Sequence, residues 1–151
     1  MPNWCYNRIT IYGDSETEAK LKEIEETFRK AQPFNDIFPI PDFKTIPNEE
    51  GVLPVLKQEF NKDGSLFYET YNFPDGKNDD RWYMWCVNNW GTKWDAGDVD
   101  IEYNDAEILE LEFDSAWSPP EGIKEKLREK YPELSFQCFY DEPGCEAAGY
   151  Y

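Results

Sequence analysis

Hydrophobic and polar side chains alternate in the first part of the chain. Between residues 7 and 12, Ile9 and Ile11 are separated by Arg8 and Thr10. A period of two residues is typical of a strand that has one buried face. We therefore predict a strand over residues 7–12, with its polar side chains on the face opposite the two isoleucines.

The spacing then changes to that of a helix. Ser15 and Glu18 have the spacing of a capping box, in which each side chain accepts a backbone N–H bond from the other residue. This pair predicts a helix that starts at Ser15 and continues to residue 31. Its apolar positions are Leu21, Ile24, Phe28 and Ala31.

A second helix and a final strand are predicted near the C-terminus. Ser118 is the expected N-cap, Pro119 the first helical position, and Glu121 the partner in a second capping box. The helix is expected over residues 119–131, with the strand at residues 134–140.

A hairpin is predicted between these two helices, with its turn at residues 104–106. The apolar side chains of its strands are Val99, Ile101 and Tyr103, followed by Leu109, Leu111 and Phe113. Six carboxylates alternate with them: Asp98, Asp100, Glu102, Glu110, Glu112 and Asp114. Because the apolar side must pack on the helices, we expect the carboxylates to form one exposed band, called the acidic band below.

Residues 32–97 are less regular. Five prolines from Pro33 to Pro54 keep the first part of this stretch extended or looped. Apolar residues on both sides of an Asp63-Gly64 turn predict a small hairpin. Asp79 or Asp80 is expected to cap a short helix that Gly91 ends.

The predicted order is strand, helix, insertion, strand, strand, helix, strand. This order fits the ferredoxin-like βαββαβ fold, an α+β architecture with one antiparallel sheet and both helices on one face. We predict a single domain over residues 1–151, with an irregular insertion at about residues 32–97.

Composition narrows the range of partners. The 151 residues include 32 acidic and 15 basic side chains, for a formal net charge of −17, and 17% are aromatic. The aromatic share argues against a disordered acidic tail. The charge opposes contact with nucleic-acid phosphates and membranes, and favours a protein with a basic surface. An RNA-binding module of the same fold would use the open sheet face, where we place Arg8, Tyr12 and Phe139, but the acidic band argues against that use.

The residues of common catalytic sites are missing. There is no histidine, and therefore no histidine-based triad, zinc-protease motif or histidine general base. No glycine-rich phosphate loop is present. The cysteines Cys5, Cys86, Cys138 and Cys145 lack paired spacing, so we expect reduced and mostly buried thiols in the cytoplasm. We predict no catalysis, no metal and no cofactor; oligomeric state stays open.

Five short motifs carry a resemblance. MPNWC at residues 1–5, NWGTKWDA at 89–96, AWSPP at 116–120, YPEL at 131–134 and EPG at 142–144 resemble the YubB-like family of phage and plasmid proteins. The resemblance covers nearly the whole chain. It implies a ferredoxin-like fold and an origin as an accessory gene of a mobile element, in a family without an established general function. Because the chain ends soon after Gly149, it also implies a short or missing last edge strand.

Two surfaces are candidate binding sites. The acidic band is interpreted as a partner-binding face that substitutes for phosphates, with simple solubility as the alternative. In the motif NWGTKWDA, Trp90 and Trp94 are interpreted as a platform with Lys93 and Asp95 as polar anchors, or else as indoles packed in the core.

The functional prediction follows from the acidic band. We predict an interaction protein that binds, and inhibits, a host nucleic-acid-handling or defence protein, as a DNA mimic of the anti-CRISPR or anti-restriction type. The alternative is a small-ligand or nucleotide-binding module that uses the tryptophan-rich motif.

Overall fold

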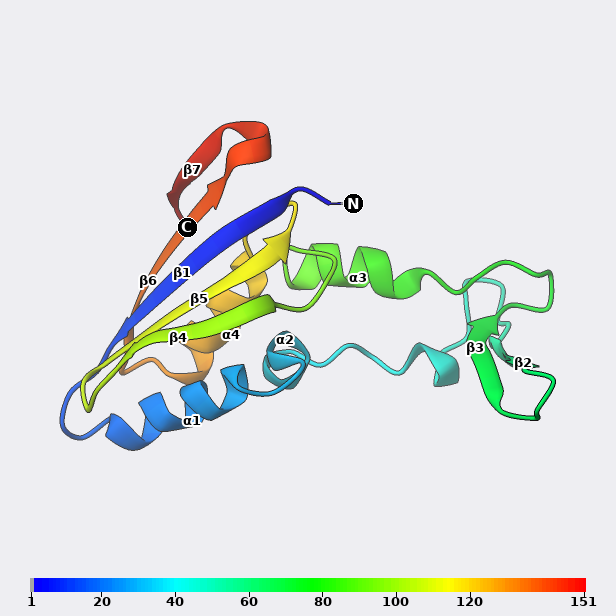
Figure 1. Ribbon diagram of the computed structural model, residues 1–151, viewed down its shortest axis with the longest axis horizontal. Coiled ribbons are helices and arrows are strands. Elements are labelled where there is room, and N and C mark those ends of the chain that lie inside the picture. Colours follow the sequence, from blue (N-terminus) through cyan, green and yellow to red (C-terminus); the bar gives the residue numbers. More distant parts are fainter. Residues whose placement is uncertain (1) are drawn as a thin grey trace. The chain divides into compact units, whose positions relative to one another are not determined.

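The computed structural model describes residues 2–151 and divides them into two compact units (Figure 1). The core unit comprises residues 2–39 and 86–151, and the insert unit comprises residues 40–85. Parts of the predicted insertion, at residues 32–39 and 86–97, therefore belong to the core unit. Whether residues 1–151 behave as a single domain stays a prediction.

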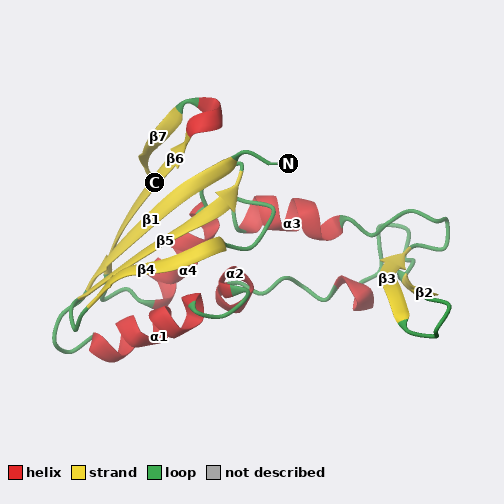
Figure 2. Ribbon diagram, in the orientation of Figure 1, coloured by secondary structure: helices red, strands yellow, loops and turns green. Residues whose placement is uncertain are grey.

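The core unit contains a five-stranded antiparallel sheet with the order β4-β5-β1-β6-β7 (Figure 2). Its strands are β1 (Trp4–Tyr12), β4 (Gly97–Asn104), β5 (Ile108–Ala116), β6 (Ser135–Glu142) and β7 (Ala147–Tyr150). The ferredoxin-like prediction is confirmed by strands β1, β4, β5 and β6 together with α1 (Glu18–Phe28) and α4 (Glu121–Lys130), with β1 between β5 and β6. β7 is present as a four-residue edge strand.

The hydrophobic core lies between one face of this sheet and the two helices. Ile9 pairs with Leu111, and Ile11 with Leu109, so these buried side chains share a face, as their alternation predicted. The helices contribute the buried residues Leu21, Ile24, Phe28, Ile123 and Leu127. Phe28 stacks on Phe113 with ring centroids 5.8 Å apart, which joins α1 to β5.

Both predicted capping boxes are wrong. α1 begins at Glu18 after Thr17, whose hydroxyl accepts the Asp14 backbone N–H at 2.7 Å. α4 begins at Glu121 after Pro120, because the Ser118 hydroxyl donates to the Gly91 carbonyl. A neighbouring local bond at α1, and a contact with a distant segment at α4, thus replace the predicted capping bonds.

The alternation of the sequence also predicts the wrong face of β4 for Tyr103. A register shift between Ile101 and Tyr103 places Tyr103 opposite Glu110, where it is half exposed and donates its hydroxyl to Asp105 at 2.7 Å. A β-bulge adds one residue to a strand, and one residue is enough to move every later side chain to the other face.

The insert unit holds the predicted hairpin, made of β2 (Val55–Phe60) and β3 (Leu66–Asn72). Gly64 in its turn has a φ of +88°, a conformation that favours glycine. The unit also contains η1 (Phe43–Thr45). α3 (Arg81–Asn89) follows as predicted: the Asp79 carboxylate accepts the Arg81 N–H at its start, and Gly91 with φ +90° lies just beyond its end.

The remaining elements are α2 (Pro33–Ile37) and η2 (Pro143–Cys145) in the core unit. Within residues 2–151, no helix combines the length and the apolar character that crossing a membrane would require.

Candidate functional site

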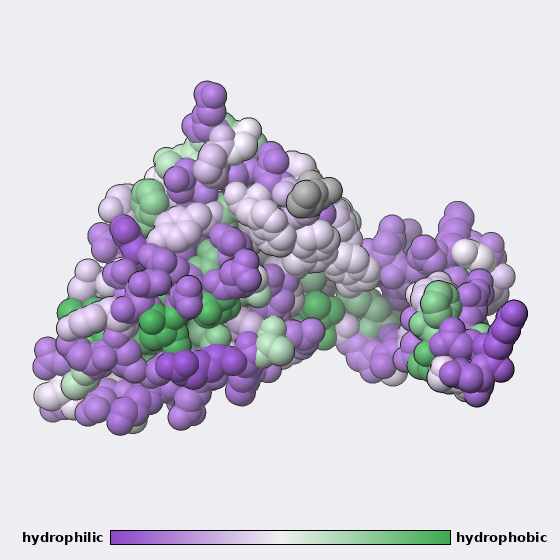
Figure 3. Space-filling model, viewed as in Figure 1, coloured by the Kyte–Doolittle hydropathy of each residue, from purple (hydrophilic) through white to green (hydrophobic). Residues whose placement is uncertain are grey.

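The open face of the five-stranded sheet is acidic on its β4–β5 side. The structure brings the six predicted carboxylates onto these two neighbouring strands, with Asp100 opposite Glu112 and Asp114 opposite Gly97. Figure 3 shows hydrophilic residues on this face of the core unit, with hydrophobic residues visible between them. The predicted carboxylates therefore lie near one another, and their role as a partner-binding face stays a prediction.

Glu112 lies at the centre of the acidic band. The Tyr6 hydroxyl donates to Glu112 Oε1 at 2.6 Å, and the pKa of Tyr6 rises to about 12, first through burial and then through this bond. The negative charge of Glu112 is also the main reason why the pKa of Glu102 is raised. On the same face, the Thr10 hydroxyl donates to Glu110 at 3.1 Å.

A second pair of closely spaced carboxylates, Asp98 and Asp114, lies at the other end of the band. Burial raises the pKa of Asp114, and the charge of Asp98 adds to this shift. Asp98 itself has a φ of +47°, next to a register shift between Gly97 and Asp100. None of the ion pairs found among the described residues involves a carboxylate of the band. Among residues 2–151, the band therefore holds like charges together without a salt bridge to any of them.

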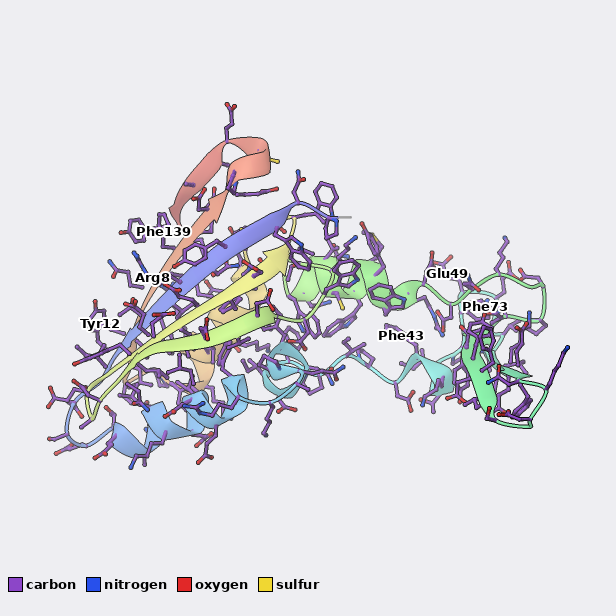
Figure 4. The ribbon with its side chains drawn as sticks, in the orientation of Figure 1. Arg8, Tyr12, Phe43, Glu49, Phe73 and Phe139 are labelled. Carbon is purple, nitrogen blue, oxygen red and sulfur yellow. The ribbon has the colours of Figure 1, made fainter. Side chains whose placement is uncertain are left out.

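The β1–β6 side of the same face is aromatic. Figure 4 shows Arg8, Tyr12 and Phe139 projecting from these strands, with the Arg8 guanidinium 5.2 Å from the centre of the Phe139 ring. Tyr150 on β7 packs edge-on against Phe139 at 5.4 Å. Arg8 thus stacks on an aromatic ring although its strand position faces Glu112.

Half of the tryptophan-rich motif has a structural role. Trp90 is only 2% exposed, and its indole N–H donates to the Phe38 carbonyl at 2.8 Å. Its ring also meets the ring of Phe34 edge-on. Asp95 accepts the backbone N–H of Phe34 at 2.9 Å and of Asn35 at 3.0 Å, so it caps the start of α2. Burial raises the pKa of Asp95, and these backbone bonds oppose the shift.

The other half of the motif lies at the surface. Trp94 is 39% exposed and lies 6.0 Å from Trp4 between ring centroids. The Lys93 ammonium is 4.2 Å from the Trp94 ring and 5.9 Å from the Trp117 ring. Trp4 and Trp117 are half exposed as well. We call Trp4, Lys93, Trp94 and Trp117 the tryptophan cluster.

Three of the motifs that carry the YubB-like resemblance meet at this cluster. The backbone N–H of Trp117 donates to the Asn3 carbonyl at 2.9 Å, which joins residues 1–5 to 116–120. The buried Thr92 hydroxyl donates to the Ala116 carbonyl at 2.8 Å, which joins 89–96 to 116–120. The sequence analysis did not single out Trp4 and Trp117, although the recurrence of tryptophan in all three motifs was a usable signal.

The thiols offer little reactivity. Cys5, Cys86 and Cys138 are buried, and burial raises the pKa of each to about 11. Cys145 is exposed and donates to Glu142, which also raises its pKa. A raised pKa keeps these groups as neutral thiols at physiological pH.

Comparisons with known proteins agree with this fold. Residues 89–151 match the family model of the ferredoxin-like domain in Api92-like proteins. This segment is similar to that domain. The crystal structure of the protein api92 from Yersinia pseudotuberculosis superposes with a TM-score of 0.57 at 13% identity, covering 99% of this chain and 93% of that one. At this identity the likeness shows the fold alone. No curated protein matches the chain.

Proposed function

We propose that this chain is a non-enzymatic interaction protein whose acidic band binds the basic, nucleic-acid-facing surface of another protein and inhibits it. The observation that carries the proposal is the crowding of six carboxylates on β4 and β5, none of which takes part in the ion pairs found among the described residues. Like charges placed across a strand pair destabilise a sheet, so the arrangement costs stability that a basic partner would restore.

The charge density of the band is close to that of a duplex. From Asp98 to Glu102 the strand rises by roughly 14 Å at about 3.4 Å per residue. Six carboxylates over that length give one charge per roughly 2.3 Å, against about 1.7 Å along duplex DNA. A cleft that evolved to neutralise phosphates would therefore meet a comparable field.

Several parts of the proposal rest on the YubB-like resemblance and on composition. We assign the chain to a mobile genetic element, and its target to a nucleic-acid-handling or defence protein in the host cytoplasm. Inhibition would be of the anti-CRISPR or anti-restriction type. The protein would act without a cofactor or metal, and without binding nucleic acid directly.

Binding kinetics test this assignment. A variant with Asp100→Asn, Glu102→Gln, Glu110→Gln and Glu112→Gln is compared with a control that loses four exposed carboxylates elsewhere, at Glu16, Glu26, Glu49 and Glu50. Both variants change the net charge equally. The binding partner is a protein that the immobilised wild-type chain captures from a host lysate. Against this protein, the band variant should associate at least about tenfold more slowly at low salt, with a weaker salt dependence. Equal association rates for the two variants would reduce the band to a solubility feature.

The tryptophan cluster supports a second candidate function, a small-ligand or nucleotide site. The favouring observation is Trp117, a bulky residue held at φ +71° with its side chain half exposed. Such strain is expensive for a large side chain and is concentrated at functional sites. Adjacent indoles with the Lys93 ammonium suit a flat, anionic ligand such as a nucleotide. Nucleotides that raise the melting temperature at high salt, and lose this effect in Trp94→Ala, would support this site.

A further inference from the structure

The hairpin of the insert unit exposes a large part of its apolar surface. Six side chains on β2 and β3 are between 41% and 69% exposed: Val55, Leu56, Phe60, Leu66, Phe67 and Tyr68. A two-stranded hairpin is marginally stable by itself, and gains stability when a further strand or a packed layer covers it. The hairpin therefore has the surface of a sheet that continues into another strand.

The two edges of the hairpin differ. The outer edge of β3 is covered at its C-terminal end, where Asn72 bridges to Asn78 and the Asp79 N–H donates to the Tyr71 carbonyl at 3.3 Å. On its other side, β2 has no neighbouring strand in the part of the chain that the structure describes. β2 is thus the edge that is open to a further strand.

The backbone groups on the open edge belong to alternate residues. The Asn61 N–H donates to the Ser65 carbonyl at 2.8 Å, so the backbone of Asn61 faces β3. Since N–H and C=O groups alternate between the two sides of a strand, the backbones of Leu56, Gln58 and Phe60 face the open edge.

We propose that β2 pairs with β2 of a second copy of this chain, antiparallel and centred on Gln58. This register places the outward backbone groups of Gln58 opposite those of its copy. It also places Leu56 opposite Phe60 of the second copy, and the reverse, which joins an aliphatic and an aromatic side chain twice. A two-fold axis makes such a contact closed and self-complementary.

Charge complementarity singles out this register. It pairs Lys57 with Glu59 of the second copy, and the two-fold axis repeats that pair. Self-pairing of β3 centred on Glu69 would instead place two carboxylates opposite each other. The insert unit also carries nine acidic and five basic residues, against 23 and ten in the core unit, so the contact uses the less acidic part of a strongly acidic chain.

Charge reversal tests the pairing directly. In sedimentation at about 0.5 mM, a concentration suited to an interface as small as one strand pair, the full-length protein should form a dimer. Lys57→Glu or Glu59→Lys alone would place like charges opposite each other twice, and should weaken the dimer at least about tenfold. The double variant K57E/E59K should restore it.

A mixture of the two single variants gives the most decisive test of the proposed register. The two single variants carry only opposite charges at the contact when they are combined, so an equimolar mixture should form a heterodimer although each variant alone is monomeric. A monomeric wild-type protein, or a dimer that neither single variant weakens, would overturn the proposal. The second result would assign the dimer to another surface.

A backbone test avoids side-chain charge. Gln58→Pro removes an N–H that faces the open edge but leaves the backbone hydrogen bonds between β2 and β3 intact. It also removes the side-chain bond from Gln58 to Glu69 at 3.0 Å, which the control Gln58→Thr removes as well. This variant should be monomeric with an unchanged circular dichroism spectrum, whereas Gln58→Thr, which keeps the N–H, should stay dimeric. A dimer that survives Gln58→Pro would contradict strand pairing.

Discussion

The two units of this protein are stabilised in different ways. Apart from Pro54, every buried apolar side chain found among the described residues, from Cys5 to Cys138, belongs to the core unit. In the insert unit both strands of the hairpin are largely exposed. The core unit can therefore carry the repulsion in its acidic band, because hydrophobic burial stabilises it independently of charge.

The insert unit is held together instead by the contacts of Arg81 with Asp79, Phe43 and Phe73, called the polar node below. Arg81 forms a two-pronged ion pair with Asp79, at 2.8 and 2.9 Å, and donates to the Phe43 carbonyl at 2.8 Å. Its guanidinium also stacks 5.0 Å from the ring of Phe43 and 5.4 Å from that of Phe73 (Figure 4). One side chain thus gathers η1, the end of β3 and the start of α3, which shows how a segment with almost no core can hold a defined shape.

Hydrogen exchange should show the largest difference between the units. Amides of β1 and β5 are expected to exchange through global unfolding, whereas those of β2 and β3 should open locally. The opening free energies should differ by about 5 kcal/mol or more. Native-state exchange followed by NMR measures both in one sample, at a concentration where the protein is monomeric. Equal protection in the two hairpins would show that the insert unit has a stabilising core after all.

Within the core unit, the two indoles of the tryptophan-rich motif should differ clearly in how much they contribute to the free energy of unfolding. Trp90→Ala leaves a cavity in the core and removes the indole N–H bond to the Phe38 carbonyl, and should lower the free energy of unfolding by about 3–5 kcal/mol. Trp94→Ala is the matched control and should cost clearly less, because its ring is partly exposed. Denaturant titration measures both. A larger loss for Trp94 would mean that the surface cluster stabilises the fold.

The polar node predicts an intermediate and local effect. Arg81→Met removes the charge but keeps much of the apolar stem, and leaves Asp79 without its partner. We expect a loss of roughly 2 kcal/mol in the local stability of the insert unit. The core unit's own stability, followed by the hydrogen exchange of its β1 and β5 amides, should not change. A parallel loss in both units would show that they unfold together.

The smallest effect concerns the acidic band. Because the charge of Glu112 raises the pKa of Glu102, the folded state binds this proton more tightly than the unfolded state. The stability that Glu102 contributes therefore falls as the pH rises above 4.5, the ordinary pKa of a glutamate side chain. Glu102→Gln should raise the melting temperature slightly at pH 7 and lose this advantage at pH 4. The control Glu16→Gln should leave it unchanged, and a lower melting temperature for Glu102→Gln would mean that repulsion in the band is negligible.

Fold and site were predictable to different extents. The order of strands and helices, the central place of β1 and the position of the acidic band follow from alternation and helical spacing. The capping boxes did not form, because Thr17 bonds Asp14 and Ser118 reaches Gly91 across the fold. At the first helix the competing bond is local, between residues three apart, whereas at the second helix it comes from a distant segment of the chain.

The tryptophan-rich motif shows the same limit. Sequence analysis grouped Trp90 and Trp94 because they are neighbours in the chain, yet one indole is in the core and the other at the surface. Trp94 lies against Trp4 of the first strand, and the adjacent Lys93 lies against Trp117 of the loop after β5, and no local pattern connects these segments.

The sequence by itself determined which side chains share a strand face and where charge accumulates, because the period of a strand or helix is a property of the local backbone. It also determined the charge complementarity within β2. Only the tertiary structure decided that Glu102 lies beside Glu112, that a bulge turns Tyr103 outward, and that three distant motifs meet around Trp94. These outcomes depend on register and on contacts between remote segments, which are set when the whole core packs and every strand finds its neighbour.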